Sequence, residues 1–270
     1  MNFKTVRIVA SISLLLVLGF AISCIKKTIP IAPPVPPAVT LKDGLLLYLP
    51  FNGTIADSSG NNNTVALIDS SGPVFTTDEN GHSNSAFYAN GTGQWLQVTN
   101  NGSIKFDSAF TLTFNFLVNF VSAYQRQVFV SMVNTTDAYG PTFEAGLSIP
   151  GMTNFCFGVD DSTAGCDNTN GGWPADVADT STFTPAASTW YNVVCIYKKG
   201  TITEYVNGQF VGTKTNSLGN TALLCPASTV NIGMWWVSDQ EALYGSVDEV
   251  RLYNRTLTLS EINSLAGKNQ

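Results

Sequence analysis

Short apolar runs recur along the chain from residue 44 onward, separated about every 8 to 12 residues by Asn, Gly, Asp, Ser or Pro. In residues 110–116, Phe and Leu alternate strictly with Thr and Asn, so one face of this strand is apolar and the other polar. The pattern predicts an all-β fold, a single sandwich. Other strands are expected at residues 45–49, 95–98, 127–133, 155–159 and 190–197.

Two local signals are sharper than the rest. Asn207-Gly208 lies between β-forming residues, which favours a two-residue type I′ turn and a hairpin over residues 201–212. Near the end of the chain, Thr258 and Glu261 have the spacing of a helix capping box, and Gly267 is a suitable stop. We therefore expect one short C-terminal helix.

Charge is scarce: only 12% of the residues are charged, against about 25% in an average globular protein. Thr, Asn and Ser supply the polarity instead, with 76 of the 270 residues. The hydrophobic share of 44% excludes a highly charged disordered chain. The formal charge of −6 argues against nucleic acid as a partner, because phosphate binding needs a basic face.

The N-terminus has the pattern of an export signal. Lys4 and Arg7 precede an apolar run at residues 8–22, and small residues lead to Cys24. This segment resembles a bacterial lipobox, which implies cleavage before Cys24 and lipidation of its thiol, although Ala21 stands where Leu is usual. An uncleaved membrane anchor is an alternative, because the run extended to Ile25 reaches about 18 residues; simple secretion is another.

The expected organisation has three parts: a signal peptide (1–23), a lipidated Cys with a Pro-rich linker (24–40) and one β domain (41–270). Loss of Lys4 and Arg7 with the signal changes the formal charge from −6 to −8. The linker contains five prolines between residues 30 and 37 and should be extended, spanning about 37 Å at 3.1 Å per residue. Ile25 is not an inner-membrane retention Asp, which favours the outer membrane of a bacterial envelope, with surface exposure open.

Five cysteines in an exported chain leave one without a disulfide partner. If Cys24 carries lipid, the other four can pair completely. Short loops favour Cys156 with Cys166 and Cys195 with Cys225, although four cysteines allow three connectivities. Four buried thiols remain the alternative.

Several segments together resemble the laminin-G-like jelly-roll domains of the concanavalin A-like lectin/glucanase superfamily. The resemblance is carried by residues 44–53, the Asp-Ser-Ser-Gly-Asn-Asn-Asn loop at 57–63, residues 84–98, and the closing stretch 245–255 followed by the capping box. It implies a two-sheet antiparallel jelly roll. It does not by itself imply a function, because the fold carries lectins, hydrolases and adhesion modules.

Hydrolysis is disfavoured by the spacing of the acids. A retaining glycosidase needs two carboxyls about 5 Å apart. No two of the six Glu residues are four apart, and neighbours such as Asp248 and Glu249 would point to opposite faces of a strand. Only a site assembled from distant residues would permit catalysis.

Calcium is the expected metal, since it prefers carboxylate, amide and carbonyl oxygens. In related jelly rolls the first loop lies near the last strand, which would bring Asp57 and Asp248 together as ligands of a structural Ca²⁺. Asn52 and Asn62 are lesser candidates. The alternative is that Asp57 makes an Asx-turn and Asp248 a backbone cap.

A ligand would most readily use exposed aromatic side chains beside polar groups. Trp173 lies in a polar loop with Asp160, Asp161 and Asn168 nearby in sequence, and one of the consecutive Trp235 and Trp236 must face outward on a strand, with Tyr244 following. Trp95 and Trp190 are expected in the core.

These patterns predict a lipid-anchored, non-catalytic module that binds carbohydrate. A structural or adhesion module with a protein partner is the alternative from another class, and a glycoside hydrolase with a dispersed site is a third.

Overall fold

The computed structural model describes residues 40–68, 72–122, 124–134, 141–147, 153–160, 177–178, 183–215, 222, 225, 228–235 and 241–267. The chain divides into two compact units, Met1–Ala38 and Val39–Gln270, and every described residue belongs to the second. The signal peptide, Cys24 and most of the linker therefore lie outside the described residues. Within the described part, no helix has the length and apolarity needed to span a membrane.

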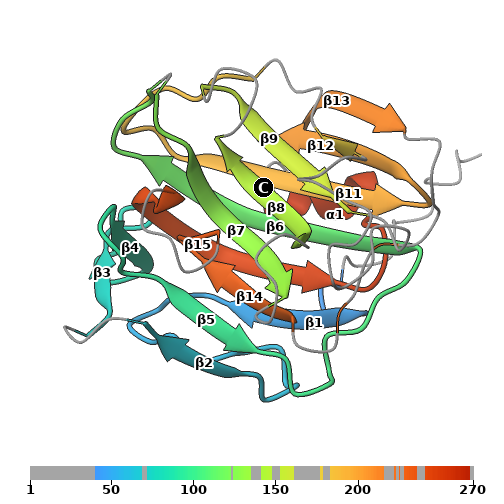
Figure 1. Cartoon of the computed structure of the whole chain (residues 1–270), viewed down its shortest axis with the longest axis horizontal. Helices are drawn as coiled ribbons and strands as arrows, with labels where there is room; N and C mark the ends of the chain where they lie inside the picture. Colours follow the sequence, from blue (N-terminus) through green and yellow to red (C-terminus); the bar gives the residue numbers. More distant parts are fainter. Residues whose placement is uncertain are drawn as a thin grey trace, which may run out of the picture. The chain divides into compact units, whose positions relative to one another are not determined.

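The second unit is an all-β sandwich of two antiparallel sheets with one short C-terminal helix (Figure 1). Sheet A has eight strands: β1 (Leu45–Leu49), β3 (Val74–Thr76), β4 (Ala86–Asn90), β6 (Ala109–Val118), β11 (Tyr191–Lys198), β12 (Thr201–Val206), β13 (Gln209–Thr215) and β15 (Tyr244–Tyr253). Sheet B has seven: β2 (Thr64–Leu67), β5 (Leu96–Thr99), β7 (Gln127–Asn134), β8 (Pro141–Leu147), β9 (Phe155–Val159), β10 (Val177–Ala178) and β14 (Ser228–Ile232).

The apolar pattern placed the strands well. Each of the six runs expected from the sequence overlaps a strand of the structure, and β1 and β9 have the expected bounds. The Asn207-Gly208 turn joins β12 to β13, with both turn residues at positive φ as a type I′ turn requires. The helix α1 (Leu259–Leu265) begins after Thr258, and the capping box with Glu261 is formed.

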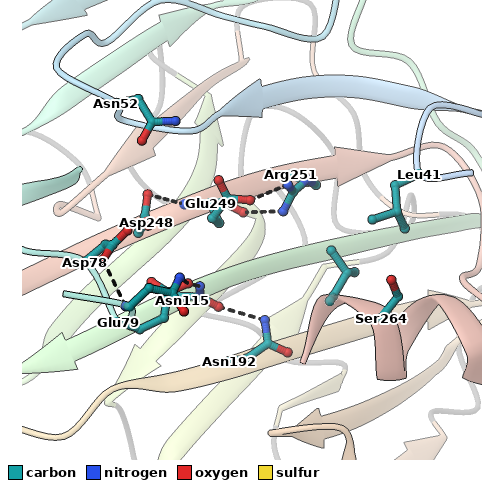
Figure 2. A pocket seen from close by; sticks show the side chains of 12 residues that line it. Leu41, Asn52, Asp78, Glu79, Asn115, Asn192, Asp248, Glu249, Arg251 and Ser264 are labelled. Atoms are coloured by element: carbon teal, nitrogen blue, oxygen red, sulfur yellow. Dashed lines mark hydrogen bonds and ion pairs between the residues drawn. The ribbon is translucent and has the colours of Figure 1, made fainter. Parts of the chain in front are cut away.

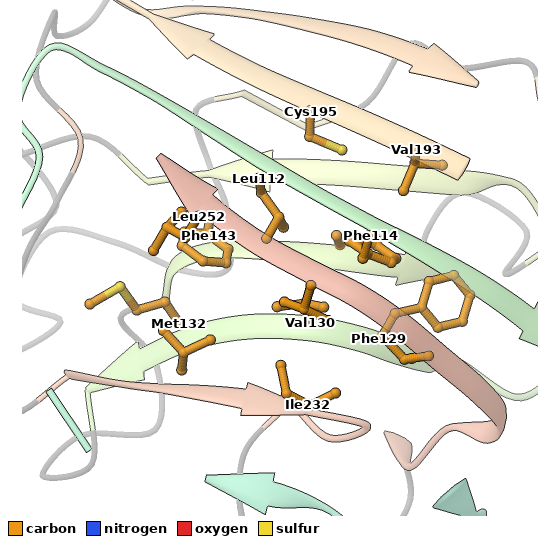
Figure 3. Close-up of a cluster of buried hydrophobic side chains, with 14 of the residues drawn as sticks. Leu112, Phe114, Phe129, Val130, Met132, Phe143, Val193, Cys195, Ile232 and Leu252 are labelled. Carbon is orange, nitrogen blue, oxygen red and sulfur yellow. The ribbon is translucent and has the colours of Figure 1, made fainter. Parts of the chain in front are cut away.

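The core lies between the two sheets (Figure 3). Phe110, Leu112, Phe114 and Phe116 of β6 all point into it, as their alternation predicted. They meet Phe129 and other apolar side chains of sheet B across the sandwich, and Phe116 stacks on Phe129 with ring centroids 4.4 Å apart.

The polar face of β6 is covered as well. Thr111, Thr113 and Asn115 point away from the core, yet each is at most 5% exposed. A second apolar cluster explains part of this cover, because Ile262 of α1 packs with Tyr253 and other residues on the outer face of sheet A. The helix thus buries part of this face, and the rest borders the site described below.

The expected disulfide pairings are not formed. Cys156 and Cys195 are buried and form no disulfide, whereas Cys225 is disulfide-bonded. Strand pairing explains the Cys195 result: it lies opposite Leu112 in β6 and its side chain belongs to the core cluster. Loop length favoured the short pairings, but the direction of each side chain decides which thiols can meet.

Candidate functional site

A row of polar side chains crosses the outer face of sheet A. Asp248 of β15 lies opposite Asn115 of β6, which lies opposite Asn192 of β11. The Asn192 Nδ2 group donates to Asn115 Oδ1 at 2.8 Å, and Asn115 Nδ2 donates to Glu79 Oε1 at 2.7 Å (Figure 2). Three neighbouring strands and one loop therefore hold these groups in a fixed arrangement.

The loop between β3 and β4 supplies two further acids and is organised by one of them. Asp78 is 8% exposed, and its Oδ1 accepts from the backbone N–H groups of Asn80 and His82 at 2.9 and 2.8 Å. Its Oδ2 lies 2.8 Å from His82 Nδ1. Gly81 provides a positive φ of 86° for the tight turn. This loop carries Glu79 to the end of the polar row.

A β-bulge in β15 corrects the expectation that Asp248 and Glu249 point to opposite faces. The pairing of β15 with β6 shifts between Asp248 and Arg251, and Glu249 has a φ of 54°. Both carboxylates consequently line the same cavity. Glu249 is paired there with Arg251 and accepts a hydrogen bond from the Tyr48 hydroxyl.

Asp78, Glu79 and Asp248 form an acidic group in which one ligand oxygen from each lies within 4.8 Å of the others. Burial, followed by the charges of Glu79 and Glu249, raises the pKa of Asp248 to about 9. Burial also raises the pKa of Glu79. Burial opposes ionisation of Asp78 too, but hydrogen bonds from His82 and Asn80 outweigh it and lower its pKa. Without a cation, the Asp248 carboxyl therefore keeps its proton at neutral pH.

The acidic group could hold a metal ion. Its donors are carboxylate oxygens, the type that hard divalent cations prefer, and the exposed Asn52 lines the same cavity. No salt bridge in the described part of the chain involves Glu79 or Asp248. A cation would therefore replace the Asp248 proton as the positive charge that balances the acidic group.

Two adjoining cavities of about 230 and 270 Å³ form what we call the amide groove. They share Glu79, Asn80, Asn115 and Asn192, together with Ser264 and Leu265 at the end of α1. The first continues to the acidic group, and the second to Trp190 and Asn207.

The Trp190 end of the groove is ordered by the β12–β13 turn. Asn207 Oδ1 accepts from the backbone N–H of Asn192 at 2.8 Å, so the turn is tied to β11.

Trp95 is 5% exposed and belongs to the core, as expected. Trp190 is half-buried and lines the groove instead, because it precedes the first paired residue of β11.

The predicted metal ligands do not converge as expected. Asp57 is not among the residues that line the cavity with Asp248. Its carboxylate accepts from the backbone N–H groups of Tyr48, Ser59 and Asn63 at 2.9 to 3.1 Å. These hydrogen bonds outweigh burial and lower the pKa of Asp57. Asp57 thus closes its own loop against β1, which is the Asx-turn alternative.

The two predicted amides lie in different places. Asn52 lines the cavity of the acidic group. Asn62 is exposed, and its backbone carbonyl accepts from Asn101 Nδ2 at 3.2 Å. Only Asn52 and Asp248 of the predicted metal set therefore share this cavity.

The predicted ligand-binding set is only partly described. Trp173, Asp161, Asn168 and Trp236 lie outside the described residues, as does Cys166. Asp160 is buried at 3% exposure. Tyr244 is 36% exposed. Trp235 is half-buried against sheet B.

Trp235 covers an arginine-centred cluster on the outer face of sheet B. The Arg126 guanidinium pairs with Glu144 and with Glu241, and its carbon lies 5.0 Å from the Trp235 ring centroid. Glu144 and Glu241 are far apart in sequence, so spacing alone did not relate them. Both carboxylates are held by one cation, which is the arrangement of a structural ion pair rather than of a free nucleophile and acid.

Sequence reasoning missed most of the amide groove. A weak signal was present, since Asn is depleted in strands and yet Asn115 and Asn192 fall within strong strand patterns. The adjacent Asp78 and Glu79 in a Gly-containing loop were a second signal. Neither signal indicated that the loop with Asp78 and Glu79 meets the strands that carry Asn115 and Asn192.

Comparison with known proteins places the chain in a family. The profile described as the Concanavalin A-like lectin/glucanases superfamily matches residues 90–263. No curated protein sequence matches.

Solved structures share the fold at low identity. The binding domain of Paraclostridial Mosquitocidal Protein 1 is 20% identical with a TM-score of 0.61, over 85% of this chain and 53% of that one, so this chain spans about half its length. Domain 4 of AbnA, a GH43 extracellular arabinanase from Geobacillus stearothermophilus, was solved with arabinotriose. It is 16% identical with a TM-score of 0.60, over 82% of this chain and 98% of that one. Botulinum neurotoxin type C, whose cell entry depends on interaction with two ganglioside molecules, is 15% identical with a TM-score of 0.60. The match covers 85% of this chain and 52% of that one.

Proposed function

We propose that this chain, which belongs to the concanavalin A-like lectin/glucanase superfamily, is a membrane-anchored, non-catalytic carbohydrate-binding module. The observation that carries the proposal is the amide groove, where the half-buried Trp190 borders a row of Asn side chains. Binding sites of this kind combine an apolar surface with a few fixed polar groups that set orientation.

The chemistry of the groove suits a sugar. Amide groups both donate and accept hydrogen bonds, as sugar hydroxyls do, and the face of an indole ring can pack against the C–H face of a pyranose or furanose. Asn115 and Asn192 are already held by their own hydrogen bonds, so a ligand would meet a preorganised surface.

We further propose that a structural Ca²⁺ binds the acidic group of Asp78, Glu79 and Asp248. The ion would compensate the carboxylates beside the groove and hold the β3–β4 loop against β15. This replaces Asp57 with two ligands from another loop, and it keeps Asp248 and Asn52 from the sequence prediction.

Two similar structures support the ligand class. The arabinanase domain was solved with an arabino-oligosaccharide, and the neurotoxin interacts with gangliosides. Because identity is below 25%, these likenesses show only the shared fold, and the assignment to this chain depends on its own groove.

The location is also a proposal. Cys24 would carry lipid, and the Pro-rich linker would hold the domain away from the outer membrane of a bacterial cell. Metabolic labelling with a fatty acid should mark the wild type and not Cys24→Ser, and protease treatment of intact cells would show whether the domain faces outward.

A glycan array with the domain 41–270, followed by calorimetric titration of each hit, tests the function. Trp190→Ala should weaken binding at least tenfold, because the loss of one stacking surface removes about 1.4 kcal/mol or more. Phe210→Ala is the matched control: Phe210 is 58% exposed on β13 and packs on Tyr205, which does not line the groove.

The alternatives have distinct outcomes. A domain that binds no glycan, yet retains a specific protein in a pulldown from the envelope, would be an adhesion module. Release of reducing sugar that disappears in Glu144→Gln would instead establish a hydrolase on sheet B.

A further inference from the structure

We propose that Tyr88, Phe120 and Tyr244 form a second carbohydrate-binding surface, which stacks against a neutral sugar unit of a chain longer than the amide groove can hold. We call these three residues the aromatic platform. The inference deepens the proposed function and depends on it.

The platform is a cluster of rings outside the main core. The Tyr88 and Tyr244 ring centroids are 6.3 Å apart at an interplanar angle of 69°, and those of Phe120 and Tyr244 are 5.7 Å apart at 55°. None of the three belongs to a buried cluster in the described part of the chain. Tyr244 is 36% exposed, and the other two are half-buried.

The backbone around Tyr244 is held from both sides. Its N–H donates to Gln127 Oε1 at 3.0 Å, and its carbonyl accepts from the N–H of Asn119 at 2.9 Å. Gln127 Nε2 in turn donates to the carbonyl of Phe120 at 2.9 Å. A buried glutamine thus ties two of the three ring-bearing residues together, so little conformational entropy remains to be lost on binding.

Close packing also fixes the Tyr244 side chain. Gly91 has a φ of 77°, and a Cβ atom there would lie 3.0 Å from the Tyr244 Cβ. The glycine lets the β4–β5 connection approach the ring directly. Burial and the neighbouring Tyr244 hydroxyl raise the pKa of Tyr88.

The chemistry of the platform favours a neutral sugar over other partners. Its rings are accompanied by phenol and amide groups, and the contacts that fix it involve no charged side chain among the described residues. A neutral ligand with C–H faces and hydroxyls complements this set. A stable protein interface would need roughly 800 Å² on each partner, far more than three partly buried rings present.

The platform and the groove lie on the same face of sheet A. Tyr244, Ser246 and Asp248 alternate along β15 before its bulge, so their side chains point the same way. Ser246 is paired with Tyr88 of β4. Asp248 is four positions after Tyr244, which is about 13 Å at 3.3 Å per residue. Ser246 and Asp248 are themselves buried, so an oligosaccharide that joins the two sites would pass over the residues that cover this part of β15.

The platform is tested by calorimetric titration with neutral oligosaccharides of increasing length. Arabino-, cello- and malto-oligosaccharides are used, from single sugars to hexasaccharides. The wild-type domain should bind longer members of one series more tightly than short ones. Tyr244→Ala should remove this gain, a loss of about tenfold for the longest member, and leave the affinity for the shortest binding member unchanged. Phe120→Ala should act in the same direction, and Phe210→Ala should have no effect.

Each outcome separates the two proposals. If longer members gain affinity equally in wild type and in both platform variants, the platform is wrong and the groove stands. If the platform variants weaken binding and Trp190→Ala does not, the groove is wrong and the platform stands. If no series and no array glycan binds, both proposals are wrong. The melting temperature of each variant shows whether a loss of binding reflects unfolding.

Discussion

The outer faces of the two sheets each carry a set of acids, and the two sets are compensated differently. On sheet B, Glu144 and Glu241 are both paired with Arg126. On sheet A, Glu79 and Asp248 have no salt bridge among the described residues, and Asp248 has a pKa raised to about 9. The first set is complete without a ligand. The second set could bind a cation, and it borders the amide groove on which the proposed function depends.

Removing the shared cation should have the largest effect. Arg126→Met leaves Glu144, which is 3% exposed, as a buried carboxylate without its guanidinium, and the free energy of unfolding should fall by about 3 to 5 kcal/mol. Urea denaturation measures it. Glu241→Gln keeps the buried pair with Glu144 and should cost much less. Equal losses in both variants would mean that Arg126 is not the centre of the cluster.

Calcium should have the next largest effect, and only through sheet A. At one hundred times the dissociation constant, a bound ion adds about 2.7 kcal/mol to the stability of the fold. Calorimetric melting should show a higher melting temperature in excess Ca²⁺ than in EDTA for the wild type and for Glu241→Gln. Asp248→Asn should show no such rise. Because Asp248 holds a proton without a cation, binding should strengthen as pH rises from 6 toward the pKa of about 9. A rise that persists in Asp248→Asn would place the ion elsewhere.

Asp57 tests the original pairing of Asp57 with Asp248. Asp57→Ala removes the acceptor of three backbone N–H groups, and unfolding should become easier by about 2 kcal/mol. The response to Ca²⁺ should stay that of wild type. Loss of that response, with the fold intact, would restore Asp57 as a ligand. Asn62→Gly, at an exposed position whose φ of 55° suits glycine, is the matched control for stability.

A third acid, outside both sets, gives the smallest effect. Glu261 pairs with Arg255 and caps α1 through Thr258; the hydrogen bond from Arg255 lowers its pKa to about 2. Ionised Glu261 therefore adds stability above its ordinary pKa of about 4.5, which is lost as pH falls toward 2. Glu261→Gln keeps the box geometry and should cost about 1 kcal/mol at pH 7. Melting scans from pH 7 to pH 2 should show a shrinking difference in melting temperature between Glu261→Gln and the wild type. A difference that stays constant with pH would contradict the charge effect.

Local patterns predicted much of the fold. The alternation in β6, the Asn207-Gly208 turn and the Thr258 capping box each depend on residues close in sequence, and each forms as expected. Trp190 and the cysteines were less predictable. Whether a residue at a strand end enters the core, or which thiols meet, depends on the neighbouring strands.

The sequence by itself determined the class of fold, the position of the strands and helix, and the scarcity of charge. Those properties follow from periodicity and composition. Only the tertiary structure decided the site: β15 lies between β6 and β4, so that the loop with Asp78 and Glu79, the bulge at Asp248 and the amides of Asn115 and Asn192 meet on one face. Segments more than a hundred residues apart contribute to it, and no local pattern encodes which strands become neighbours.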